Sequence, residues 1–118
     1  MVSYRDRLDI IADILNVVSR DAKKTQIMYQ ANLSYKVLQR YLSEVTGALL
    51  VTFEDEFQRY RLTFKGQQYL DAYKDYSRCS KNMEKHLLDF SAKKKVLETL
   101  CPMKQFFEEE ENETITSN

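Results

Sequence analysis

The C-terminal part of this chain contains a long run with neither glycine nor proline, from Gln67 to Leu100. Only two glycines and one proline occur among the 118 residues, so little is present to interrupt helices and a mainly helical protein is favoured. One helix over this run would be about 50 Å long at 1.5 Å per residue, which is more than a small domain can cover. The sequence therefore predicts a compact domain followed by a helix that needs another partner.

Side chains along this predicted helix recur at the heptad spacing of a coiled coil. One series of positions seven apart runs from Tyr69 to Leu97, and its companion series runs from Tyr73 to Cys101. We expect a dimer seam between two copies of the chain, with packing onto its own domain or onto a different protein as the alternative. The predicted interface residues are Tyr69, Tyr73, Tyr76, Ser80, Met83, Leu87, Phe90, Lys94 and Leu97.

Lys94 indicates how the two helices of such a seam would be oriented. In a parallel pair it would face its own copy, which places two like charges together. An antiparallel pair with its two-fold axis near Lys85 instead sets Lys94 beside Tyr76 and Met83 beside Leu87. The charge therefore favours an antiparallel coiled coil, in this register or in one shifted by a heptad.

The first helix of the compact domain is predicted over residues 4–19. Ser3 and Asp6 have the spacing of a capping box, and apolar residues then recur every three or four positions. Thr25 is the expected N-cap of a short second helix that carries Ile27, Met28 and Ala31.

A third helix, a hairpin and the long helix complete the predicted order. Ser34 is the expected N-cap of the third helix and Gly47 its C-terminal stop. Residues 49–53 and 58–62 read as two strands joined by a hairpin, and Thr63 caps the long helix, which ends before Pro102. This order predicts a mainly α fold with a small β-hairpin, a winged helix-turn-helix domain followed by the coiled-coil helix.

The run KTQIMYQANLSYKVLQRYLSEVTGALL, followed by YRLTFKGQQYL, resembles a small archaeal winged-helix DNA-binding family that includes chromatin-associated proteins of Sulfolobus. The resemblance covers about residues 5–100, and K-T-x-I-M-Y-x-A-N-L-S-Y is its most distinctive part. It implies a winged-helix fold, dimerisation through an antiparallel coiled coil of the last helix, and DNA binding as a chromatin component or a transcriptional regulator. The resulting domains are 1–65 for DNA binding, 66–101 for dimerisation and 102–118 for an acidic, disordered tail.

No acidic residue occurs from Ala22 to Ser43, although 18 Lys+Arg balance 18 Asp+Glu in the whole chain. Exposed helices usually mix both signs of charge, and phosphates would repel carboxylates, so this stretch indicates a polyanionic partner. The alternative is an ordinary solvated helical face. The side chains predicted to bind double-stranded DNA here are Lys23, Lys24, Ser34, Tyr35, Lys36, Gln39, Arg40 and Ser43.

The predicted wing offers a weaker signal for DNA contact. Its tip, Glu54-Asp55-Glu56, is acidic where a wing that enters the minor groove would normally be basic. We therefore expect any wing contact to come from Arg59 or Arg61 on the flank, with a solvent-facing strand edge as the alternative.

The sequence offers little for other chemistry. Two cysteines and the single histidine, His86, do not match the usual zinc spacings, so no metal and no cofactor are expected. Neither a catalytic triad nor a phosphate-binding glycine loop is present, so we predict no enzymatic activity. No apolar stretch is long enough for a membrane span and no signal peptide is recognised, which predicts a cytoplasmic, nucleoid-associated protein.

Two functions fit these features. The favoured one is a dimeric, sequence-specific or semi-specific DNA-binding protein, an archaeal transcriptional regulator or a chromatin-associated protein. Balanced charge favours regulation over bulk packaging. The alternative is a winged-helix adaptor for protein–protein contacts that does not bind nucleic acid. The tail acids, Glu108 to Glu111 and Glu113, would either keep the protein soluble or compete with DNA for the basic face.

Overall fold

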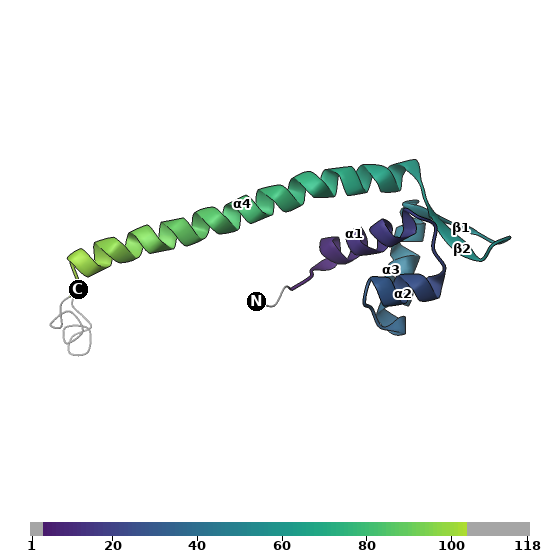
Figure 1. The fold of residues 1–118 in the computed structure, drawn as a ribbon, viewed down its shortest axis with the longest axis horizontal. Helices are drawn as coiled ribbons and strands as arrows, with labels where there is room; N and C mark the ends of the chain where they lie inside the picture. The colour runs from purple at the N-terminus through teal and green to yellow at the C-terminus, as the bar shows by residue number, and fades with distance from the viewer. Residues whose placement is uncertain (1–3, 104–118) are drawn as a thin grey trace, which may run out of the picture. The chain divides into compact units, whose positions relative to one another are not determined.

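The computed structural model describes residues 4–103 and divides into two compact units that meet between Arg78 and Cys79. The elements follow one another in the order of a winged helix-turn-helix domain (Figure 1). This order confirms the predicted fold class of helices, one hairpin and a long last helix. The elements are α1 (Arg7–Val18), α2 (Lys24–Gln30), α3 (Tyr35–Gly47), β1 (Val51–Glu54), β2 (Arg59–Leu62) and α4 (Phe64–Leu100).

The first helix starts later than the sequence predicted. Asp6 is the N-cap of α1: its Oδ1 accepts from the Asp9 N–H at 2.9 Å, and the Asp6 N–H donates to Asp9 Oδ2 at 3.1 Å. The capping box is therefore formed by Asp6 and Asp9, and the prediction of Ser3 with Asp6 is wrong. An aspartate can serve at both positions because either carboxylate reaches the other residue's backbone N–H.

The start of α2 also differs from the prediction. Lys23 is the N-cap, and its N–H donates to Oε1 of Gln26 at 2.9 Å, so the Thr25 cap is wrong. Just before it, Ala22 pairs with Tyr60 of β2 through two backbone hydrogen bonds of 3.1 and 2.7 Å. This bridge was not predicted, and it fixes the α1–α2 connection against the hairpin.

Ser34 caps α3 as predicted, because its Oγ accepts from the Val37 N–H at 3.2 Å. Gly47, however, is the last helical residue rather than the stop. The chain reverses at Leu49, whose φ of 65° is left-handed, and the Leu50 N–H donates to the Val45 carbonyl at 2.9 Å. A left-handed residue just after a helix allows its last carbonyls to be satisfied, and here leucine adopts that conformation in place of glycine.

The strands β1 and β2 are antiparallel, with Val51 opposite Leu62 and Glu54 opposite Arg59. Thr63 alone separates β2 from α4, and its Oγ1 accepts from the Gly66 N–H at 3.0 Å, which confirms Thr63 as the cap. The Thr63 N–H donates to the Leu50 carbonyl at 3.1 Å, and its hydroxyl lies 2.7 Å from the Leu49 carbonyl oxygen. At the other end α4 stops at Leu100, before Pro102, as predicted.

One apolar core joins the elements of the first unit. α1 buries most of its apolar side chains, from Ile11 to Val18, and α2, α3, β1 and the beginning of α4 each add at least one buried side chain. Each such side chain contributes about 1.5–3 kcal/mol relative to an exposed one. The largest fully buried side chains are Ile14, Leu15, Ile27, Leu38, Val18, Val45 and Val51.

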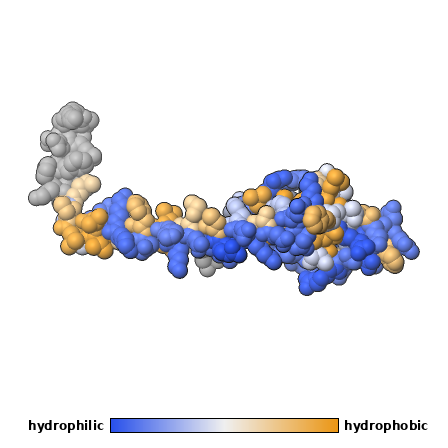
Figure 2. All heavy atoms as spheres, turned by 90° about the horizontal axis from the view of Figure 1, so that it is seen from above, coloured by the Kyte–Doolittle hydropathy of each residue, from blue (hydrophilic) through white to orange (hydrophobic). Residues whose placement is uncertain are grey.

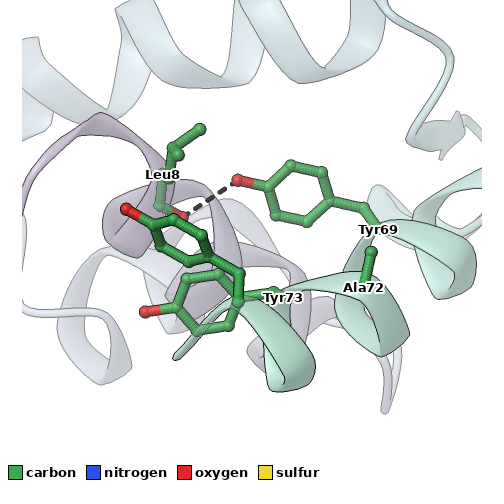
Figure 3. Close-up of a pocket in the computed structure, with 5 residues that line it drawn as sticks. Leu8, Tyr69, Ala72 and Tyr73 are labelled. Atoms are coloured by element: carbon green, nitrogen blue, oxygen red, sulfur yellow. Dashed lines mark hydrogen bonds between the residues drawn. The ribbon is translucent and has the colours of Figure 1, made fainter. Parts of the chain in front are cut away.

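The first turns of α4 pack on α1 through two tyrosines (Figure 3). The Tyr69 hydroxyl donates to the Leu8 carbonyl at 3.0 Å, and the Tyr73 hydroxyl donates to the Asp9 carboxylate. With Ala72 and Tyr76 they line a shallow apolar pocket of about 200 Å³. Tyr69 and Tyr73 of the predicted seam thus contact their own domain, and both remain partly exposed.

The second unit contains the rest of α4, and its apolar side chains lie on the surface (Figure 2). Met83, Leu87, Phe90 and Leu97 are 64–68% exposed. Ser80 and Lys94 of the predicted seam are exposed as well. The acidic tail predicted at 102–118 lies, beyond Met103, outside the described residues.

Candidate nucleic-acid interface

The helix α3 has one buried and one exposed face. Leu38, Tyr41, Leu42 and Val45 are at most 7% exposed and hold the helix against the core. Because residues on a helix repeat every 3.6 positions, the side chains between them point outward. The structure places every α3 residue of the predicted interface on this exposed face, namely Tyr35, Lys36, Gln39, Arg40 and Ser43.

Lys24 connects the start of α2 to the exposed face of α3. Its Nζ lies 3.2 Å from the Tyr35 hydroxyl and 4.5 Å from the centre of the Tyr35 ring. The same ammonium donates to Oε1 of Gln39. Three predicted interface residues from two helices are thus brought together. The sequence could not show this contact, because it depends on how α2 packs against α3.

Two further predicted residues lie at the N-termini of these helices. Lys23 is exposed at the N-cap of α2, and Ser34 is exposed at the N-cap of α3. Backbone N–H groups in the first turn of a helix attract anions. These positions therefore extend the positively charged face beyond the side chains of α3.

Glu44 is the first acidic residue after the acid-free stretch, and its charge is compensated within the protein. Its Oε1 accepts from Nη2 of Arg7 at 2.9 Å and from Nε of Arg7 at 3.2 Å. This pair joins α3 to α1. Because Arg7 offsets the carboxylate, Lys36 and Arg40 keep an environment that favours anions.

The two wing arginines are engaged by carboxylates of the same chain. Nε of Arg59 lies 2.6 Å from Oε1 of Glu54, and Nε of Arg61 lies 3.5 Å from Oδ1 of Asp21. The hydrogen bond that Arg59 donates to Glu54 raises the pKa of Arg59 above its ordinary value. Both wing arginines are thus paired within the chain, and the Arg61 side chain also keeps 53% of its surface exposed.

Residues 4–103 lack the features of two other protein classes. There, no group of three or more His, Cys, Asp or Glu side chains could hold a metal ion. Within the same range, none of the helices combines the length and the apolar character that crossing a membrane requires.

The chain is similar to known proteins in both sequence and structure. Residues 4–81 match the model of a family described as winged helix-turn-helix. An uncharacterized protein of Methanocaldococcus jannaschii is 41% identical over 73 residues, which are 57% of this chain and 31% of that protein. The chain thus spans about a third of the length of that curated relative.

A solved structure is also similar to this chain. The crystal structure of Sso10a-2, a DNA-binding protein from Sulfolobus solfataricus, superposes with a TM-score of 0.64 at 26% identity. The match covers 85% of this chain and 100% of that one, and it confirms the resemblance to small archaeal winged-helix proteins. The chain belongs to the winged helix-turn-helix family.

Proposed function

We propose that this protein binds double-stranded DNA through the exposed face of α3 and the start of α2. The observation that carries the proposal is the charge of this face: it presents Lys23, Lys24, Lys36 and Arg40, and its sequence from Ala22 to Ser43 has no acidic residue. The nearest following acid, Glu44, is paired with Arg7. Support comes from the similarity to Sso10a-2, which is described as a DNA-binding protein.

In this proposal α3 lies in the major groove, whose width admits one helix. Lys36 and Arg40 contact phosphates or the guanine edge, and Gln39 contacts a base edge. Lys23 and Ser34, near the helix N-termini, hold the sugar-phosphate backbone and set the orientation on the duplex. Tyr35 and Ser43 lie on the same exposed face and complete the contact surface.

The contact between Lys24 and Gln39 adds a detail to base reading. A glutamine pairs with adenine by accepting through its oxygen and donating through its NH₂ group. In the free protein the oxygen already accepts from Lys24. The oxygen has a second lone pair, so Gln39 can accept from adenine whether Lys24 keeps this contact or turns toward a phosphate.

The proposal includes a homodimer through the exposed part of α4. Side chains such as Met83, Leu87 and Phe90 leave apolar surface in water at heptad spacing, and a second antiparallel copy would cover it. A dimer would carry two α3 surfaces, as regulators that read paired half-sites do. The balanced charge of 18 basic and 18 acidic residues supports a regulator at the nucleoid rather than bulk packaging.

A mobility-shift titration across a range of salt concentrations tests the proposal. Native protein is expected to bind duplex DNA with an affinity that falls steeply with salt. The variant Lys36→Ala with Arg40→Ala is expected to lose most binding and to flatten the log–log salt slope by about 0.9 for each phosphate contact removed. The matched control, Lys81→Ala with Lys85→Ala, removes two exposed lysines of α4 that lie off the seam.

The outcomes separate DNA binding from a protein adaptor. Loss of binding in the α3 variant with retention in the α4 control supports the proposal. Equal losses in both variants would indicate that overall charge, rather than the α3 face, governs binding. No shift by native protein at any salt would refute DNA binding and favour the adaptor.

A further inference from the structure

Four charged side chains form a cluster between the wing and the α1–α2 connection. Glu54 ends β1, Arg59 and Arg61 lie on β2, and Asp21 precedes α2. Besides the pairs at 2.6 and 3.5 Å described above, Nη2 of Arg59 lies 3.9 Å from Oδ2 of Asp21 and Nη1 of Arg61 lies 3.7 Å from Oε2 of Glu54. Each arginine thus faces both carboxylates, and the cluster has no net charge.

The backbone fixes this cluster in place. Asp21 has a left-handed φ of 55°, and the next residue, Ala22, is hydrogen-bonded to Tyr60 between the two arginines. Glu54 and Arg59 are directly opposed in the ladder. Both carboxylates are therefore held beside the guanidinium groups by main-chain bonds rather than by flexible side chains alone.

Stability alone gives a weak reason for such a cluster. The side chains keep 27–53% of their surface exposed, and ion pairs with this much exposure contribute little to stability. The cluster should have a larger effect on the binding of a polyanion than on stability. A guanidinium that is already paired with a carboxylate adds little to DNA affinity when it binds a phosphate, because one ion pair is exchanged for another. Fewer counterions are then released from the DNA.

We infer that Asp21 and Glu54 withhold Arg59 and Arg61 from DNA phosphates and thereby confine the DNA footprint to α2 and α3. The inference rests on the proposed function. It makes Asp21 and Glu54 positioning residues that act through the two arginines. Their removal would convert the wing into a second phosphate-binding element.

The wing tip provides a matched control. Asp55 and Glu56 are exposed, lie on the same hairpin and carry the same two charges, but within residues 4–103 neither forms an ion pair. Asp21→Asn with Glu54→Gln and Asp55→Asn with Glu56→Gln therefore change the net charge equally. Only the first variant frees the arginines.

The experiment measures affinity for a fixed duplex from 50 to 200 mM salt by fluorescence anisotropy. Asp21→Asn with Glu54→Gln is expected to bind several-fold more tightly at low salt. Its log–log salt slope should steepen by about 0.9–1.8, which corresponds to one or two new phosphate contacts. The tip variant is expected to keep the native slope. Equal slopes in these two variants would refute the inference.

A double-mutant cycle with Arg59→Gln and Arg61→Gln measures how much the two arginines contribute to the salt slope. In the native background this pair of substitutions should leave the slope unchanged, and in the Asp21→Asn, Glu54→Gln background it should abolish the increase. A reduced slope in the native background would mean that the arginines already contact DNA, which overturns the inference alone.

Two controls complete the test. Circular dichroism checks that each variant is folded. If Asp21→Asn with Glu54→Gln does not fold, Asp21→Asn alone takes its place, and the same outcomes are then expected for one freed arginine. Absence of DNA binding by the native protein and by every variant would refute the proposed function, and this inference with it.

Discussion

The Tyr73 hydroxyl of α4 donates a hydrogen bond to the Asp9 carboxylate of α1, although the two residues are 64 positions apart. Asp9 is also part of the capping box of α1. The hydrogen bond from Tyr73 is the main reason why the pKa of Asp9 lies below its ordinary value of 3.8. Burial and the same hydrogen bond raise the pKa of Tyr73. One carboxylate therefore both starts α1 and holds the beginning of α4.

Tyr73→Phe should lower the free energy of unfolding by about 1 kcal/mol near pH 7, because it removes a hydrogen bond to a charged, partly exposed acceptor. Since the folded pKa of Asp9 is depressed, its contribution is fully present above the unfolded value of 3.8 and is lost as pH falls through the folded pKa. The difference between native and variant protein should therefore begin to shrink as pH falls below about 4 and vanish only below the folded pKa of Asp9. Urea unfolding at several pH values measures this. A difference that is constant with pH would contradict the linkage.

Gly66→Ala should destabilise the domain by about 1–3 kcal/mol, as overpacking of a core does. A Cβ at Gly66 would lie 2.2 Å from the Leu50 carbonyl oxygen and 2.5 Å from Cδ1 of Leu62. At Gly47 nothing lies within 4 Å of such a Cβ. Gly47→Ala is therefore the control and should stabilise α3 by up to about 1 kcal/mol. Thermal unfolding of both variants checks whether Gly66→Ala lowers the melting temperature and Gly47→Ala raises it.

Leu87→Glu should dissociate the proposed dimer, because it places a carboxylate in the seam. The neighbouring Leu88 is equally apolar and 72% exposed, but it lies off the heptad series, so Leu88→Glu should remain dimeric. Sedimentation equilibrium at micromolar concentration distinguishes the two. A monomeric native protein, or equal dissociation of both variants, would rule out the seam.

Arg5→Lys should reduce the free energy of unfolding by about 1–2 kcal/mol. The guanidinium of Arg5 donates to the carbonyls of Ala31 and Asn32 at 2.7 and 3.0 Å and also to Asp13 at 2.8 Å. A lysine cannot make this forked set of bonds. The control is Arg7→Lys, which retains an exposed ion pair with Glu44 and should change stability by less than about 0.5 kcal/mol. Chemical unfolding curves compare the two, and equal losses would argue against the forked geometry.

The sequence predicted the elements of this fold better than their ends. The buried stripe of α3 and the cap at Ser34 could be predicted, because both depend on spacing within one helix. The starts at Asp6 and Lys23 and the reversal at Leu49 could not, since a cap is selected by backbone angles that several neighbouring polar residues could adopt.

Parts of the candidate site required tertiary structure. Tyr69 and Tyr73 fit the heptad series, but packing on a domain and packing in a seam demand the same helical spacing, and only their hydrogen bonds to α1 show where they lie. The pairing of Asp21 with Arg61 likewise depends on the bridge between Ala22 and Tyr60, which joins distant parts of the chain.

Thr63 is the only residue between β2 and α4, and it is hydrogen-bonded on both sides. Its backbone and hydroxyl groups contact the Leu49 and Leu50 carbonyls while its oxygen caps the helix, so the same residue anchors both elements. A rotation of the first turn of α4 should therefore move the hairpin with it, because Thr63 connects the two through hydrogen bonds as well as through the chain.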